Sequence, residues 1–232
     1  MRRVTAQPPA SVPPTSPQAP ARLILVRHGQ TAHNRERRMQ GQVDTPLDET
    51  GQRQARLLAA HLRRLGVQAP RIHASDLSRA HATAEALHRE LGGTLATFPE
   101  LREISLGDWE GHLYDEIAAR HPELHGQFWS GDPECCPPGG ETPQAVGERV
   151  YAHALAHWPQ AGETLMLVSH GIAISALLTR LLGLDYQTEF QSRRYLHLNT
   201  AYSVLTVDPA SREVLSAEVA QAGHLTAEET GR

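Results

Sequence analysis

The chain contains no lysine: all 22 of its permanently positive side chains are arginines, set against 26 acidic ones. A lysine Schiff base and the lysine-containing phosphate loop of P-loop nucleotide-binding proteins are therefore both excluded. Any anion that the protein binds must be held by arginine, histidine or backbone N–H groups. Arginine suits this task because its planar guanidinium forms two parallel hydrogen bonds to a phosphate and stays charged.

Cysteines and long hydrophobic runs are also scarce. The two cysteines, Cys135 and Cys136, are adjacent and cannot build a disulfide framework, which is typical of cytoplasmic proteins. No apolar run approaches the roughly 20 residues that a membrane-spanning helix needs. A net charge of −4 gives no broad basic surface of the kind that binds nucleic acid. We therefore expect a cytoplasmic protein that binds neither nucleic acid nor membrane.

The 232 residues are enough for one substantial domain, for which we predict the limits 21–220. Residues 1–20 are rich in proline, serine and alanine and lack periodic apolar positions, which predicts a disordered tail. Residues 221–232 are interpreted as a C-terminal tail.

Strand-like and helix-like segments alternate within the predicted domain. Strands are predicted over 22–26, 71–75, 94–98, 164–169, 194–198 and 202–208, and helical stripes over 55–65, 80–91, 146–158 and 172–182, the last ended by Gly183. This alternation predicts an α/β fold, a three-layer sandwich in which helices flank both faces of a central, mostly parallel sheet.

Two predicted strands end in the same way. "LILV" runs into Arg27, His28 and Gly29, and "LMLV" runs into Ser169, His170 and Gly171. Ligands of open α/β sheets bind outside the carboxyl ends of the strands, so neighbouring strands would place the two histidines side by side. The glycines let the backbone turn and approach a ligand, and each leads towards a helix start whose N–H groups favour an anion. The repeated ending predicts one anion site.

Two further segments add charged groups to this site. "ASDLSRAHATAE" places Arg79 in a first helical turn after a strand, and "LREISLGDWEG" places Glu103 after a short apolar stretch. Phosphoryl transfer uses such a set: arginines and a protonated histidine as a positive clamp, a second histidine as nucleophile, and a carboxylate for proton transfer. This chemistry requires no metal and no cofactor. Residue types alone leave open which histidine attacks, and which nearby acid serves: Glu100, Glu103, Asp108 or Glu110.

The order of the four segments "LVRHGQTAHN", "ASDLSRAHATAE", "LREISLGDWEG" and "LVSHG" closely resembles that of the histidine phosphatase superfamily, also called phosphoglycerate mutase-like. The resemblance covers about residues 23–207. It implies that His28 is the phosphorylated nucleophile and Glu103 the proton donor. It further implies that the phosphate is bound by Arg27, Arg79, His170 and the neighbouring Gly171, with Asn34 and Gln40 lining the pocket as in the phosphatase branch.

Three functions remain after this resemblance: a phosphomonoester hydrolase, a phosphoglycerate mutase, and a phosphate-recognising module that has lost catalysis. "REISLGDWEG" and "PPGGET" resemble the phosphatase branch, and both the nucleophile and the acid are present. The phosphatase is therefore favoured, with a small phosphorylated substrate. Relatives act on sugar phosphates, phosphoserine, α-ribazole phosphate, phosphoglycerates and phosphoproteins, and we expect residues 105–147 to set the selectivity. A homodimer is compatible with the sequence but not required by it.

Other residues allow competing interpretations. His121 and His125 have the spacing of metal ligands but lack a third one, which favours a solvated face. His61, His88, His153 and His157 are interpreted as helix-surface residues. The arginines Arg35, Arg37 and Arg38 form either a basic rim or a solvated loop. The aromatic residues of the middle segment form either a lid over the substrate or a small core: Trp109, Tyr114, Phe128 and Trp129.

Overall fold

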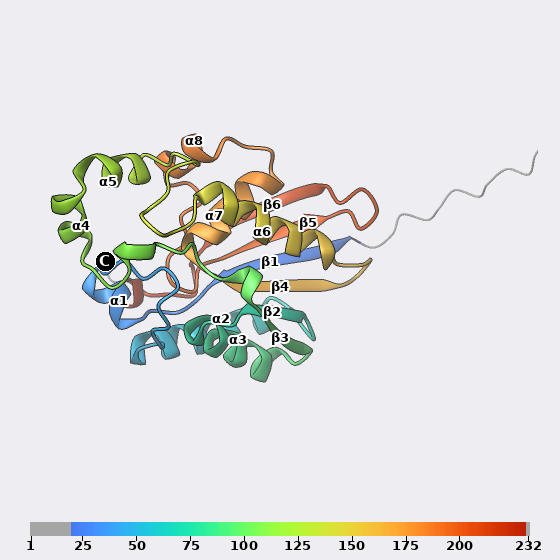
Figure 1. Cartoon of the computed structure of the whole chain (residues 1–232). Coiled ribbons are helices and arrows are strands. Elements are labelled where there is room, and N and C mark those ends of the chain that lie inside the picture. The colour runs from blue at the N-terminus through green and yellow to red at the C-terminus, as the bar shows by residue number, and fades with distance from the viewer. Residues whose placement is uncertain (1–19, 231–232) are drawn as a thin grey trace, which may run out of the picture.

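Parallel strands form the centre of a six-stranded sheet in the computed structural model, which describes residues 20–230 (Figure 1). The strands are β1 (Ala21–Arg27), β2 (Arg71–Ser75), β3 (Thr94–Phe98), β4 (Thr164–Ser169), β5 (Tyr202–Val207) and β6 (Val214–Gln221). Their order is β3-β2-β4-β1-β5-β6, and β3, β2, β4 and β1 run parallel while β5 is antiparallel to both of its neighbours. The predicted mostly parallel sheet is confirmed.

Helices cover both faces of this sheet (Figure 1). The helices are α1 (Ala32–Glu36), α2 (Glu49–Arg64), α3 (Ser78–Leu91), α4 (Tyr114–Arg120), α5 (Pro122–Trp129), α6 (Pro143–Ala156), α7 (Gly171–Leu181), α8 (Tyr186–Ser192) and α9 (Ala227–Thr230), with short 3-10 turns η1 (Pro99–Leu101) and η2 (Gly107–Trp109). α2 and α3 pack on one face and α6 and α7 on the other, so the predicted three-layer arrangement is confirmed (Figure 1).

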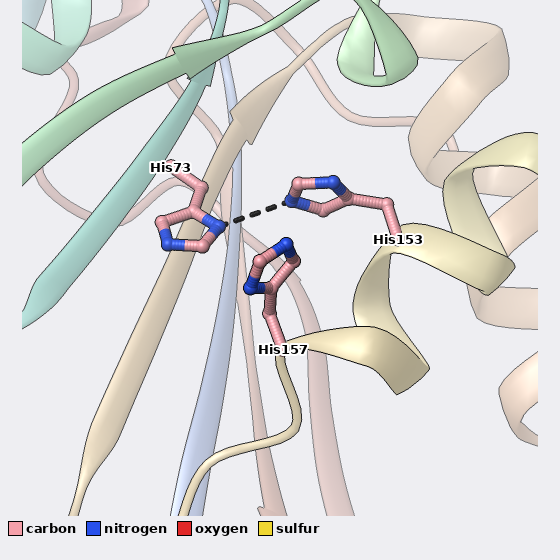
Figure 2. A group of neighbouring side chains, drawn as sticks. All are labelled: His73, His153 and His157. Carbon is pink, nitrogen blue, oxygen red and sulfur yellow. Dashed lines mark hydrogen bonds between the residues drawn. The ribbon is translucent and has the colours of Figure 1, made fainter.

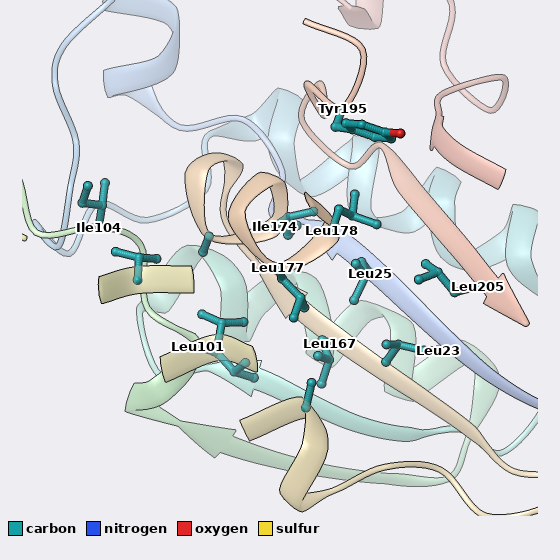
Figure 3. Close-up of a cluster of buried hydrophobic side chains, with 14 of the residues drawn as sticks. Leu23, Leu25, Leu101, Ile104, Leu167, Ile174, Leu177, Leu178, Tyr195 and Leu205 are labelled. Atoms are coloured by element: carbon teal, nitrogen blue, oxygen red, sulfur yellow. The ribbon is translucent and has the colours of Figure 1, made fainter. Parts of the chain in front are cut away.

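Strand β1 shows why the sheet is buried on both sides. Leu23 and Leu25 face the cluster under α6 and α7, while Ile24 and Val26 face the cluster under α2 and α3. Successive side chains of a strand point to opposite faces, so a continuous apolar run fits a strand that is covered on both. Figure 3 shows Leu23 and Leu25 beside Leu167 of β4 and below α7.

The helix ends follow local sequence signals. The side chain of Asp48 accepts a hydrogen bond from the backbone N–H of Gly51 and caps α2. α7 ends just before Gly183, whose positive φ of 64° favours glycine, as predicted. None of the helices in residues 20–230 has the length and apolar character needed to cross a membrane.

Two predictions about strands were wrong. Residues 194–198 form turns and irregular chain rather than a strand, because α8 ends at Ser192 and the next residue, Arg193, takes a left-handed conformation that turns the chain. Leu196 is exposed, whereas Tyr195 and His197 are buried. Strand β6 was not predicted, because it is an edge strand whose side chains are mostly exposed and show no clear apolar alternation.

The predicted C-terminal tail lies against α2 where it is described. The amide of Gln54 donates to the carbonyl of Glu229, and the guanidinium of Arg53 pairs with the Glu229 carboxylate. The predicted tail 1–20 lies outside the described residues except for Pro20, so the limits 21–220 stay a prediction.

Leu25→Ala tests the double-sided burial of β1. Leu25 is fully buried, so we expect its truncation to lower the free energy of unfolding by about 2–5 kcal/mol. Leu215→Ala on the exposed edge strand is the matched control and should change stability by less than about 0.5 kcal/mol. Urea unfolding of both variants measures this difference, and equal losses would contradict the arrangement.

Candidate active site

The pairing of β1 with β4 brings the two His-Gly endings together. Arg27 lies opposite Ser169 in the parallel register, and the next residues are His28 and His170. The ring centroids of these histidines are 5.1 Å apart. The predicted meeting of the two endings at the carboxyl edge of the sheet is therefore found in the structure.

A hydrogen bond sets the tautomer of His28. Nδ1 lies 2.7 Å from the carbonyl oxygen of Gly29, and since a carbonyl only accepts, Nδ1 carries the proton. Nε2 is then the unprotonated nitrogen, and it makes no hydrogen bond within the described part of the chain. His28 lines a cavity at this edge of the sheet. One of its ring nitrogens thus keeps a free lone pair at the cavity-lining residue.

Gly29 lies against the backbone of α2. A Cβ on Gly29 would lie 2.5 Å from the backbone oxygen of Gly51 at the start of α2. This close contact between two backbones requires a glycine, and the expected approach of a ligand to Gly29 stays a prediction. Gly171 opens α7, as expected, and lies beside the guanidinium of Arg27 and the carboxylate of Glu103.

Arg79 and His170 form a fully buried pair behind His28. Nε of Arg79 donates to Nδ1 of His170 at 3.3 Å, and the two terminal nitrogens donate to the carbonyls of Gly41 and Val43. Because Nδ1 of His170 accepts, its Nε2 carries the proton. That Nε2–H is buried and has no hydrogen-bond partner among residues 20–230. A buried donor left unpaired is unfavourable, and an anion beside His28 would satisfy it.

Arg27 and Glu103 lie at the wall of the cavity. Arg27 donates through Nη1 to the carbonyl of His197 at 2.6 Å, while its buried Nε has no partner in the described residues. The Glu103 carboxylate accepts from the backbone N–H groups of Ile104, Ile172 and Ala173. Two of these donors belong to the first turn of α7, where a negative charge is favoured.

Helix α6 holds the backbone that carries Glu103. The Arg149 guanidinium donates to the carbonyls of Glu100, Arg102 and Glu103 and also pairs with the Glu141 carboxylate at 3.0 Å. One arginine therefore joins the backbone before and at Glu103 to the Glu141 side chain. Arg149 belongs to no sequence motif and was not predicted.

Asn34 and Gln40 also line the cavity, as expected. Both are oriented by Thr31, whose hydroxyl lies 2.7 Å from Oε1 of Gln40 and 3.2 Å from Oδ1 of Asn34. Of the three arginines in the predicted rim, only Arg38 reaches this cavity. Its guanidinium is held by the Gly111 carbonyl and the Glu36 carboxylate.

Burial affects the protonation of both histidines. Together with the charges of Arg79 and Arg27, it holds the pKa values of His28 and His170 well below the ordinary 6.5, which favours the neutral rings. The protonated histidine of the predicted clamp stays a prediction. Burial also lowers the pKa of Arg79 to about 10, which still leaves it charged.

The cavity has a volume of about 170 Å³ and is lined by Arg27, His28, Asn34, Gln40, Glu103 and Gly171 among others. Arg79 and His170 do not reach its wall. A second cavity of about 470 Å³ shares several of its lining residues: Tyr114, Trp129, Ser175, Phe190 and Leu196. Helix α8 supplies part of the second wall through Tyr186, Glu189 and Phe190. Selectivity was predicted to depend on residues 105–147, and the contribution of α8 to the cavity wall was not predicted.

The aromatic residues of the middle segment were predicted to form either a lid over the substrate or a small core, and the structure divides them between the core and the cavity walls. Trp109 is fully buried in the core, whereas Trp129 is 37% exposed and lines both cavities. Phe128 belongs to both, since it is buried in the core and also lines the smaller cavity.

The remaining histidines also require a correction. The rings of His121 and His125 lie beside that of Trp109. His153, however, is buried rather than on a helix surface, because α6 turns this residue towards β2.

Comparison with known proteins agrees with this architecture. The family model of the histidine phosphatase superfamily (branch 1) matches residues 23–219. The probable phosphoglycerate mutase GpmB of Yersinia pestis (strain Pestoides F) is 38% identical over 173 residues, which cover 74% of this chain and 79% of the relative.

Two solved structures are also similar. YhfR of Bacillus stearothermophilus has a TM-score of 0.80 and 31% identity and covers 88% of this chain and 98% of its own. A mycobacterial glucosyl-3-phosphoglycerate phosphatase in complex with VO3 has a TM-score of 0.75 and 34% identity. The match covers 85% of this chain and 97% of the phosphatase chain. The six-stranded sheet between helical layers is thus the fold of phosphoglycerate mutase-like proteins. This chain belongs to the histidine phosphatase superfamily, branch 1.

The buried histidines predict loss of stability in acid. His197, which supports Arg27, is fully buried, and burial lowers its pKa from 6.5 to about 4. The unfolded chain therefore binds more protons than the folded chain between these values, so stability is present above pH 6.5 and is lost as the pH falls. At pH 5 this residue alone should lower the free energy of unfolding by about 2 kcal/mol.

Urea unfolding at pH 7.5 and pH 5.0 measures this loss. His197→Asn keeps a donor towards the Tyr195 carbonyl and should reduce the loss, while His88→Gln at a more exposed helix position should not. Equal stability of the native chain at the two pH values would contradict the prediction.

Proposed function

We propose that the protein is a metal-independent phosphomonoester hydrolase that acts through a phosphohistidine at His28. The observation that carries the proposal is the free lone pair on Nε2 of His28, set beside two buried, unpaired N–H donors, Nε2 of His170 and Nε of Arg27. A phosphoryl group bound to His28 would offer oxygen acceptors to both donors. The charge of Arg79 lies directly behind His170 and would stabilise the same oxygens.

The first step transfers the phosphoryl group to the protein. The Nε2 lone pair of His28 forms a bond to phosphorus while the bond between phosphorus and the ester oxygen breaks. The leaving oxygen takes a proton from the carboxyl group of Glu103. The arginines stabilise the charge on the other phosphoryl oxygens.

The second step releases phosphate. Glu103, now a carboxylate held by three backbone N–H groups, takes a proton from water as the water oxygen attacks phosphorus. The bond between phosphorus and Nε2 breaks, and its electron pair returns to His28. Arginines supply the positive charge throughout, so the proposed cycle uses no metal.

The larger neighbouring cavity supports a substrate with a sizeable organic part. Its lining combines aromatic rings with the charged side chains Glu189 and Arg193, which suits a polar group such as a sugar. The mycobacterial relative is a glucosyl-3-phosphoglycerate phosphatase, and we propose the same class of small phosphorylated metabolite for this chain. The predicted cytoplasmic location and the possible homodimer stay predictions.

A phosphoglycerate mutase is the second candidate, because the relative from Yersinia pestis is named as one. A mutase would return the phosphoryl group from His28 to the organic product instead of water. Incubation with 3-phosphoglycerate distinguishes the two: a hydrolase releases inorganic phosphate, and a mutase forms 2-phosphoglycerate.

His28→Ala tests the nucleophile. We expect it to abolish phosphate release from a panel of phosphomonoesters, including 3-phosphoglycerate and glucosyl-3-phosphoglycerate, because the proposed mechanism takes the attacking lone pair from His28. The native chain should stay active in EDTA and be inhibited by vanadate. His88→Ala is the control for histidine loss, and thermal unfolding checks the fold. Substantial turnover by folded His28→Ala would contradict the phosphohistidine, and activity lost in EDTA would contradict metal independence.

Glu103→Gln tests the proton transfer. The substitution keeps the side-chain shape but carries no transferable proton, so we expect kcat to fall by about 10²–10⁴-fold. Slow attack by water should also let the phosphohistidine accumulate, which acid-labile incorporation of labelled phosphate detects. Glu100→Gln, on the exposed side of the same loop, should leave kcat unchanged. Equal kcat values for Glu103→Gln and the native chain would remove Glu103 from the mechanism.

A further inference from the structure

Three histidines meet on the sheet face covered by α6, away from the cavity described above. His73 lies within β2, His153 lies in the last turn of α6, and His157 is the residue that caps this helix. Figure 2 shows the three rings pointing towards one another between the strand and the end of the helix. None of them belongs to the proposed catalytic machinery.

The nitrogen atoms are close enough to share one ion. Nδ1 of His73 lies 3.0 Å from Nε2 of His153, and each ring offers a nitrogen within 4.8 Å of those of the other two. Zinc binds histidine nitrogens at about 2.0–2.1 Å, so tetrahedral ligand atoms lie about 3.3 Å apart. Two nitrogens already have this spacing, and a third needs to move by about 1–2 Å, which a rotation of the His157 side chain can supply.

The ligands come from a rigid frame with a recurrent spacing. His153 and His157 are four residues apart at the end of a helix, so their side chains share one face, and His73 faces them from a central part of the sheet. The Phe98 ring lies 4.5–5.4 Å, centroid to centroid, from all three histidines and forms an apolar wall around the group. Such a wall limits the access of water to a bound ion.

The hydrogen bonding and the charges around the cluster bear on ion binding. Nδ1 of His73 and Nε2 of His153 share one hydrogen bond, so one of these two rings must turn or change its tautomer before both nitrogens can bind an ion. The Arg71 guanidinium is the unfavourable neighbour, but it donates to the carbonyl of His157 at 2.7 Å and lies 3.5 Å from the Glu163 carboxylate. Glu100 adds a negative charge near His153.

We propose that His73, His153 and His157 bind one divalent transition-metal ion, of which Zn²⁺ best matches three imidazole ligands with a fourth position open to water. Neutral imidazoles suit Zn²⁺ and related ions, whereas Mg²⁺ and Ca²⁺ require oxygen ligands. The ion would join the end of α6 to β2. Its effect is on stability rather than on turnover, because the site contains no group of the proposed phosphoryl transfer.

Zinc titration of the tag-free full chain tests the proposal. The chain is treated with EDTA, dialysed, and titrated with ZnCl₂ at pH 7.5 in a calorimeter, with thermal unfolding measured in parallel. We expect one ion per chain and, at zinc 100 times the dissociation constant, a Tm rise of roughly 5–10 °C. His153→Gln and His157→Gln should each lose the rise, and cobalt should give the visible absorption of tetrahedral Co²⁺ in the native chain only.

Two controls locate the ion. His125→Gln removes a member of the other helical pair with the same spacing, and His28→Ala removes one of the paired histidines of the candidate active site; both should retain binding. The proposal would be overturned if the native chain bound no stoichiometric zinc. It would also be overturned if either control lost binding while His153→Gln kept it. His157 is less buried than His153, so its variant keeps the test valid if His153→Gln fails to fold. The binding result stands whether or not the chain hydrolyses phosphomonoesters.

Discussion

The parallel pairing of β1 with β4 is the constraint on which the site depends. Six consecutive residues pair from Arg22 with Thr164 to Arg27 with Ser169, and both strands are covered on both faces by apolar clusters. A slip of this register by one residue would exchange the buried faces of a whole strand, so the packing holds it. The residues that follow the pairing, His28 and His170, are therefore held side by side, although 142 positions separate them.

The site concentrates positive charge on arginines that are buried or half-buried. Arg79 is fully buried, and burial lowers its pKa and that of Arg27, so their surroundings disfavour the charged guanidinium groups. The Glu103 carboxylate offsets part of this cost. A bound phosphate dianion would offset more of it and would also pair the unsatisfied N–H groups. Buried cations and unpaired donors thus favour the same class of ligand.

Helix α6 links the candidate active site to the histidine cluster. Arg149, in the middle of this helix, fixes the backbone around Glu103, and the helix ends at His153 and His157 against β2. An ion bound at the end of α6 would therefore stabilise the same helix without taking part in the proposed reaction. The two sites therefore share helix α6, although different residues carry out phosphoryl transfer and ion binding.

The sequence by itself determined the family, the layered fold and the four segments that form the site, because apolar runs, turn residues and His-Gly endings are local signals. Tertiary structure decided the rest. The lowered pKa of His170 depends on burial and on Arg79 from another helix, and the second cavity depends on α8, which has no motif. The clustering of His73 with His153 and His157 depends on how α6 packs on β2. Such features arise from contacts between residues far apart in the chain, and no local pattern encodes them.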